Sequence, residues 1–275
     1  ELCHIGYFKA IMDSLDADED TKEEIRLLIE QKNYASLSDI LGKAKENKAA
    51  RALRKLPGLF GGEEVFEKAY ELFDENGARV WVTYVGDGGF YVANQTVYNS
   101  LMYYNYKEEE LNSPNDIDHL RMTMLLPNTN QLQCPSGLKV QLLYWNGKEY
   151  TEIFPKGTRI GFVVARAGYK KDGTDVTTKN AYSFKNKTNP VVNGDVSGMY
   201  YSTPVLNKWG KSQAVTRQLD GYNCCVTGFD IRPFGDNQSD YDFNDVMLKV
   251  TATPEKAIEP VSYTHLRAHE TRRHL

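Results

Sequence analysis

The sequence predicts a mainly β protein: an antiparallel β-sandwich, jelly-roll-like, preceded by an N-terminal helical region. From residue 78 onward, apolar and polar residues alternate, which is the period of a strand with one buried face. This part also holds 15 of the 18 tyrosines, and tyrosine favours strands. Polar turns rather than helical stretches separate the segments, so we expect antiparallel pairing without crossover helices.

The first 74 residues are predicted to be helical. Apolar residues recur there at helical spacing, as in Ile25, Leu28 and Ile29. Asp20 and Glu23 have the spacing of a capping box at a helix start. Glycines at 58, 61 and 62 interrupt the pattern before a last helix, which we expect from Glu63 to Phe73.

The predicted strands follow one another closely along the rest of the chain. Asn146-Gly147 predicts a hairpin, because a type I′ turn needs positive φ at both central residues. The expected domains are a helical region 1–74, a β-sandwich 75–254 and an unstructured tail 255–275. The expected strands are Arg79–Val85, Phe90–Tyr98, Leu138–Tyr144, Glu149–Phe154, Thr158–Arg166, Ala214–Leu219, Cys225–Ile231 and Val246–Ala252.

Composition excludes some classes of function. With 33 basic and 37 acidic residues, the formal charge is −4, so nothing indicates binding to nucleic acid. No stretch approaches the roughly 18 consecutive apolar residues of a transmembrane helix, so no transmembrane segment is expected in this sequence.

The last residues are expected to be foreign to the protein. Residues 261–275 resemble one reading frame of a transposase adapter used in sequencing libraries, so we expect them to pack against nothing. They include three of the five histidines, which leaves little material for histidine-based catalysis.

An acidic loop is the candidate site. Asp240, Asp242, Asn244 and Asp245 lie just before the apolar segment Val246–Val250, and Asp230 lies at the end of the preceding expected strand. In an extended or looping backbone Asp240, Asp242 and Asn244 would share one side, with Tyr241 and Phe243 on the other. Ca²⁺ prefers six to eight such oxygen ligands, so the loop predicts a calcium site formed by these five residues.

Two other interpretations of this loop differ from the calcium site. It is not an EF-hand, because Asp245 and Thr251 occupy the positions of the turn glycine and the bidentate glutamate. Alternatively, Asp and Asn could simply cap a turn by bonding their own backbone, as these residues commonly do.

The same motif, with others in order along the chain, resembles the LruC-like domain, a bacterial domain of unknown function. The resemblance covers residues 79–253 and implies an exported or cell-surface β-sandwich module. The matching motifs are Tyr98–Tyr104, Leu126–Asn128, Phe154–Phe162, Tyr200–Ser202, Leu206–Asn207, Gly228–Asp230 and Asp240–Val246.

Three functional hypotheses follow from the loop and the resemblance. The first is a non-catalytic calcium-binding module for adhesion, whose partner is a glycan or a surface protein. The second is a hydrolase of polysaccharides that uses the acidic cluster as general acid and base. The third is a structural spacer. Trp81, Trp145 and Trp209 could stack on sugar rings, although packing explains most such residues. The cysteines, without zinc-type spacing, are expected to be buried thiols.

Overall fold

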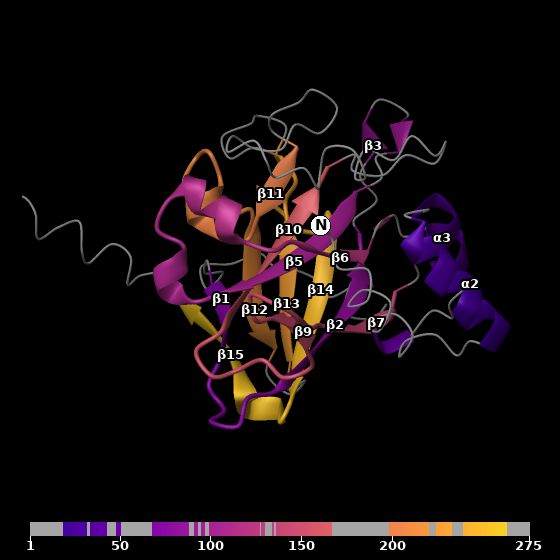
Figure 1. Cartoon of the computed structure of the whole chain (residues 1–275). Coiled ribbons are helices and arrows are strands. Elements are labelled where there is room, and N and C mark those ends of the chain that lie inside the picture. Colours follow the sequence, from indigo (N-terminus) through magenta and orange to yellow (C-terminus); the bar gives the residue numbers. More distant parts are fainter. Residues whose placement is uncertain are drawn as a thin grey trace, which may run out of the picture.

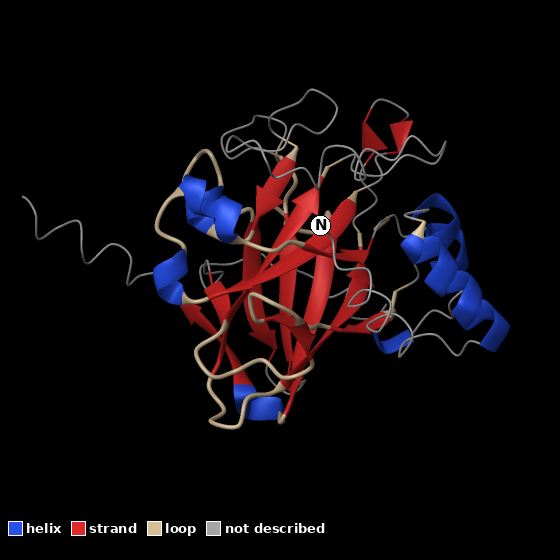
Figure 2. Ribbon diagram, viewed as in Figure 1, coloured by secondary structure: helices blue, strands red, loops and turns tan. Residues whose placement is uncertain are grey.

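The computed structural model describes residues 19–31, 34–42, 48–50, 68–87, 91–92, 95–96, 99–126, 128–129, 134, 136–166, 198–219, 224–232 and 239–262. Two antiparallel sheets dominate these residues, and a pair of helices lies beside them (Figure 1, Figure 2). The predicted mainly β, antiparallel sandwich with an N-terminal helical region is therefore confirmed.

One sheet contains six strands and the other five. The six-stranded sheet has the order β15-β1-β10-β5-β6, with β11 also paired to β10, and the five-stranded sheet has the order β12-β13-β14-β2-β7. Two short hairpins, β3–β4 and β8–β9, lie outside these sheets. The strands are β1 Lys68–Leu72, β2 Arg79–Gly86, β3 Tyr91–Val92, β4 Gln95–Thr96, β5 Ser100–Tyr106, β6 Thr123–Leu126, β7 Lys139–Gln141, β8 Tyr144–Trp145, β9 Tyr150–Thr151, β10 Arg159–Ala165, β11 Met199–Tyr201, β12 Ala214–Leu219, β13 Cys224–Phe229, β14 Val246–Thr253 and β15 Ile258–Ser262.

Helical elements are short. Among the described residues, the α-helices with given bounds are α2 Glu19–Glu30 and α3 Tyr34–Leu41, and the 3-10 turns are η1 Glu108–Glu110, η2 Pro114–His119, η4 Pro204–Leu206 and η5 Glu255–Ala257. No helix among the residues described is long and apolar enough to span a membrane.

The core lies between the two sheets. Alternate residues of β2 (Val80, Val82 and Tyr84) are buried there, as the period-two pattern predicted. Tyr70 of β1 crosses the core and forms a 2.7 Å hydrogen bond with Thr227 of β13. Polar groups buried without a partner are costly, so this bond fixes how the sheets lie against each other.

The outer face of the six-stranded sheet is also covered. Tyr104 of β5 donates a 2.7 Å hydrogen bond to the Thr203 hydroxyl, next to η4. Leu111, Ile117 and Leu206, from the segments around η1, η2 and η4, are buried in the same cluster. These turns therefore form an extra layer on that sheet (Figure 2).

Residues 68–72 form a strand where the sequence predicted the end of a helix. Residues 63–67 of that predicted helix lie outside the described residues. β1 lies between β15 and β10, with Tyr70 opposite Ile160 and Glu71 opposite Arg159. Tyr70 packs inward, while Glu71 accepts a 2.8 Å hydrogen bond from Arg159, whose side chain is buried. Two neighbouring strands stabilise an extended backbone that local propensity alone does not specify.

The sandwich also extends past the boundary expected at residue 254. β14 leads through η5 into β15, which pairs with β1 from Ile258 opposite Leu72 to Ser262 opposite Lys68. Val261 and Ser262 therefore belong to a sheet, contrary to the expectation for 261–275, because β1 leaves an edge that they complete. The rest of that expected tail, 263–275, lies outside the described residues.

Candidate functional site

The acidic loop joins two neighbouring strands of the five-stranded sheet. Asp230 directly follows β13, and Asp245 directly precedes β14. The Asp245 backbone N–H donates to the Phe229 carbonyl over 3.0 Å, which continues the β13–β14 pairing. Both carboxyl groups are buried, with exposed fractions of 2% for Asp230 and 7% for Asp245.

Backbone and side-chain donors hold these two carboxylates. Asp245 accepts a 2.8 Å hydrogen bond from the Ile231 N–H. Asp230 accepts one of 2.9 Å from the Arg232 N–H and another from the Ser239 hydroxyl. Each carboxylate thus closes part of the loop through local hydrogen bonds.

The segment from 240 to 244 forms a loop and not a regular extended strand. Tyr241 and Phe243 have φ angles of 53° and 52°, in the left-handed region. Asp242 accepts from the Asn244 N–H over 3.2 Å and from its side-chain amide. Asn244 therefore directs an N–H donor at Asp242, as a turn-capping pair does.

The predicted carboxylates nevertheless influence one another. Burial, followed by the charges of Asp230, Asp242 and Asp240, raises the pKa of Asp245 to about 7. Burial and the charge of Asp240 also raise the pKa values of Asp230 and Asp242, against the effect of their hydrogen bonds. The fold thus collects Asp230, Asp240, Asp242 and Asp245 in one region, and their repulsion favours protonation.

No group of three or more His, Cys, Asp or Glu side chains suited to holding a metal ion occurs among the residues that the structure describes. What the geometry supports directly is the capped turn. Calcium binding by Asp230, Asp240, Asp242, Asn244 and Asp245 stays a prediction, which titration of the folded chain with Ca²⁺ would test.

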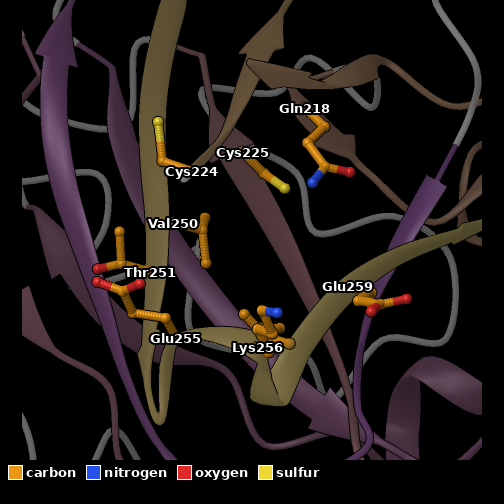
Figure 3. Close-up of a pocket in the computed structure, with 9 residues that line it drawn as sticks. Gln218, Cys224, Cys225, Val250, Thr251, Glu255, Lys256 and Glu259 are labelled. Carbon is orange, nitrogen blue, oxygen red and sulfur yellow. The ribbon is translucent and has the colours of Figure 1, made fainter. Parts of the chain in front are cut away.

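A cavity lies elsewhere, at the end of the sandwich where β14 passes through η5 to β15 (Figure 3). Its volume is about 170 Å³. The strand register places Gln218, Cys225 and Val250 side by side across β12, β13 and β14. Ile258 of β15 lies across from them, and Thr251, Glu255 and Lys256 also line the cavity. Sequence patterns did not single out these residues, because strand pairing alone brings them together.

The cysteines are buried thiols, as expected. Cys134, Cys224 and Cys225 form no disulfide among the residues described. Burial raises the pKa of Cys134 well above its usual range, and burial also raises that of Cys224. Neither of these two groups is activated as a thiolate nucleophile.

The tryptophans suggested for sugar stacking are already in contact with other side chains. The Arg121 guanidinium lies 4.1 Å from the Trp145 ring centroid, and the Tyr150 ring lies 5.0 Å from it. The Lys139 ammonium lies 4.9 Å from the Trp81 centroid. These contacts account for the two rings as cation–π and aromatic packing.

The N-terminal helices present a second surface. Ile25 of α2 and Leu41 of α3 are buried in the main apolar cluster. Asp20, Glu24 and Leu27 occupy the exposed side of α2 at spacings of four and three, and 41% of Leu27 is exposed. This spacing puts the three side chains on one helix face.

Known proteins resemble the N-terminal part of the chain, which contains these helices. Residues 1–81 match the family model of histidyl-tRNA synthetase. The ATP phosphoribosyltransferase regulatory subunit of Clostridium kluyveri is 39% identical over 72 residues, which are 25% of this chain and 18% of that protein. The same subunit of Bacillus cereus is 34% identical over 88 residues, 31% of this chain and 21% of the relative. No solved structure matches.

These matches cover only part of each protein. The chain spans about a fifth of the length of these curated relatives. The matched family segment ends at residue 81, within β2, so it includes α2, α3 and strand β1.

The matches correct the identification made from motifs. The chain is similar to histidyl-tRNA synthetase and to regulatory subunits of ATP phosphoribosyltransferase, not to the LruC-like domain. The exported calcium-binding adhesion module, with a glycan or surface protein as its partner, is therefore wrong, and the hydrolase and spacer alternatives find no support. The motifs misled because short runs of Tyr, Asn and Asp are common in the turns of many β proteins. The cellular location stays a prediction.

Proposed function

We propose that this chain acts through protein–protein contact, as a non-catalytic partner that regulates ATP phosphoribosyltransferase. The observation that carries the proposal is the 39% identity over 72 residues to a regulatory subunit of that enzyme. The match to the histidyl-tRNA synthetase family model covers the same N-terminal part of the chain, residues 1–81, and we therefore place the contact there.

The exposed face of α2 is the contact surface in this proposal. Leu27 supplies an apolar centre, and Asp20 and Glu24 supply negative charge on the same face. Glu23 forms an ion pair with Arg26 within the helix, at 2.5 Å. An apolar anchor with a charged rim is typical of protein interfaces, and the rim charges mainly affect association rate and salt dependence.

The test is binding to the ATP phosphoribosyltransferase of Clostridium kluyveri, the organism of one matched relative. Isothermal titration calorimetry with the full chain measures affinity, and the reaction rate with and without the chain measures regulation. We expect saturable binding, a changed rate and at least tenfold weaker binding by Leu27→Asp, because a buried interface anchor typically contributes about 1–2 kcal/mol or more.

Ile153→Asp is the matched control, because Ile153 is 39% exposed and lies outside the matched segment. It should bind like the wild type. Circular dichroism of both variants verifies that the fold is intact. Absence of binding by the wild-type chain, or equal weakening by both substitutions, would refute the proposal.

A further inference from the structure

The outer face of the five-stranded sheet carries a row of basic side chains. Side chains alternate between the two faces of a strand, so Thr83, which lies between the core residues Val82 and Tyr84 of β2, is on the outer face. Strand pairing puts Thr83 opposite both Lys139 of β7 and Lys249 of β14. The register extends this line across all five strands, and we call it the basic row: Lys139, Thr83, Lys249, Val226 and Arg217.

The charges of the basic row face outward. Lys139 and Arg217 are exposed, and Lys249 is half-buried. Neither lysine forms an ion pair with any residue that the structure describes. None of the described strand residues on this face of the five-stranded sheet is acidic. The row therefore suits an anionic partner.

Two carboxylates lie near the η5 end of the same face. The Arg79 guanidinium donates to Glu152 over 3.1 Å, so these two charges neutralise each other. Figure 3 shows the Glu255 carboxylate beside Thr251 of β14. The three cations of the basic row thus exceed the one remaining carboxylate, and the face keeps a positive charge.

α2 offers a surface of matching charge and length. Its five acidic residues against two basic ones give it a formal charge of −3, and Asp20 and Glu24 are exposed on one face. Twelve residues at about 1.5 Å each make α2 about 18 Å long. Four strand spacings of about 4.8 Å make the basic row about 19 Å long. The row and the helix are therefore complementary in charge over nearly the same length.

We propose that the basic row binds the acidic face of α2 in a second copy of this chain. Lys139, Lys249 and Arg217 of one copy face Asp20 and Glu24 of the other. The same α2 face is the proposed contact for ATP phosphoribosyltransferase, so self-association covers it and limits binding of the enzyme. That regulatory consequence rests on the proposed function, whereas the self-association does not.

Sedimentation velocity of the full chain alone measures the self-association, so the result does not depend on the enzyme. We expect a concentration-dependent complex of two or more copies at about 0.1 M NaCl. The association should be at least tenfold weaker at about 1 M NaCl, because the Debye length falls from about 10 Å to about 3 Å.

Charge reversal on each side tests which surfaces meet. Lys139→Glu with Lys249→Glu reverses the basic row, and Asp20→Lys with Glu24→Lys reverses α2. Each double variant should self-associate at least about tenfold more weakly than the wild type, because like charges then face each other. A mixture of the two double variants should form a complex, since the acidic α2 of the first meets the basic row of the second. Circular dichroism verifies that both variants fold.

Lys148 and Lys256 provide the matched control, because they are also exposed lysines but lie outside the basic row, in the β8–β9 turn and in η5. Lys148→Glu with Lys256→Glu should self-associate like the wild type. The proposal is overturned if the wild-type chain stays monomeric or if salt does not weaken its association. It is also overturned if the mixed variants stay apart, or if the control variant is weakened as much as the row variant.

Discussion

Asp245 is the residue that most directly connects the acidic loop to stability. Burial and the charges of three other carboxylates raise the pKa of this group to about 7, against the lowering effect of the hydrogen bond that it accepts from the Ile231 N–H. An unfolded aspartate has a pKa of about 3.9. Between these two values the folded chain holds a proton that the unfolded chain has released.

This difference predicts the pH dependence of unfolding. Because the folded state binds the extra proton, the free energy of unfolding should fall as pH rises from about 4 to 7, by at most roughly 4 kcal/mol from this group. Asp245→Asn should flatten that slope and raise stability at pH 8, since the amide oxygen can still accept from Ile231. Urea denaturation at several pH values measures both effects.

Asp116 supplies a control of opposite sign. Hydrogen bonds from the Asn112 and Ser113 backbone lower its pKa, so its contribution to stability is present above the unfolded pKa and lost as pH falls. Asp116→Asn should therefore lower stability at neutral pH. If Asp245→Asn also destabilised the chain at pH 8, the account of the acidic loop would be wrong.

At the scale of elements, the pairing of β10 with β5 depends on a small residue. Gly161 lies opposite Tyr104, and a Cβ at Gly161 would overlap the buried Tyr104 ring, which is fixed by its bond to Thr203. Such overpacking typically costs about 1–3 kcal/mol. Glycine is needed at this position because it has no side chain to overlap the Tyr104 ring, and not because of its conformational freedom.

Gly161→Ala should therefore lower the free energy of unfolding by about 1–3 kcal/mol, measured in urea. Combining it with Tyr104→Ala should recover part of the loss caused by the glycine substitution, because the overlapping ring is removed. Gly210→Ala is the comparison. An added Cβ at Gly210 would meet no neighbouring atom, but the residue has a φ of 68°, so backbone strain should lower the free energy of unfolding by about 1–2 kcal/mol. An unchanged stability of Gly161→Ala would contradict the packing described for β5 and β10.

For the whole molecule, the matched family segment and the folding unit have different limits. The match ends at residue 81, but β1 lies inside the six-stranded sheet, between β15 and β10, and β2 begins at Arg79. Tyr70 of β1 forms a hydrogen bond with Thr227 across the core. Glu71 of β1 accepts a hydrogen bond from Arg159 of β10. The segment is thus shared between the helices and the sandwich.

Truncated fragments test whether the sandwich needs β1 to fold. A fragment of residues 68–262 retains every strand that the structure describes and should unfold cooperatively, although it loses the buried Ile25 and Leu41. A fragment of residues 73–262 loses only β1 and leaves β10 and β15 without their common neighbour, so it should not fold. Circular dichroism and thermal melts distinguish them, and cooperative melting of the shorter fragment would show that β1 is dispensable.

The local sequence determined the alternating strands, the presence of a hairpin at Asn146-Gly147, the antiparallel fold class and the helical spacing of α2 and α3. Each depends on residues close together in the chain, where period and turn chemistry act. The acidic residues of the loop were found for the same reason. The arrangement of these residues in space could not be predicted from the local sequence. The φ angles of Tyr241 and Phe243 and the hydrogen bonds of Asp242 depend on how the loop closes between β13 and β14. The type I′ turn expected at Asn146-Gly147 is wrong: only Gly147 of the pair has a positive φ, and the loop between Trp145 and Tyr150 has four residues.

Only the tertiary structure decided the rest. Residues 68–72 became a strand, and 258–262 joined them, because each completes the hydrogen bonding of the other across nearly two hundred residues. The cavity likewise arises where Gln218, Cys225 and Val250 align by strand register and Ile258 approaches from the opposite sheet. A pattern confined to neighbouring residues carries no information about partners so distant in the chain, and these pairings gain their stability only when both sheets are in place.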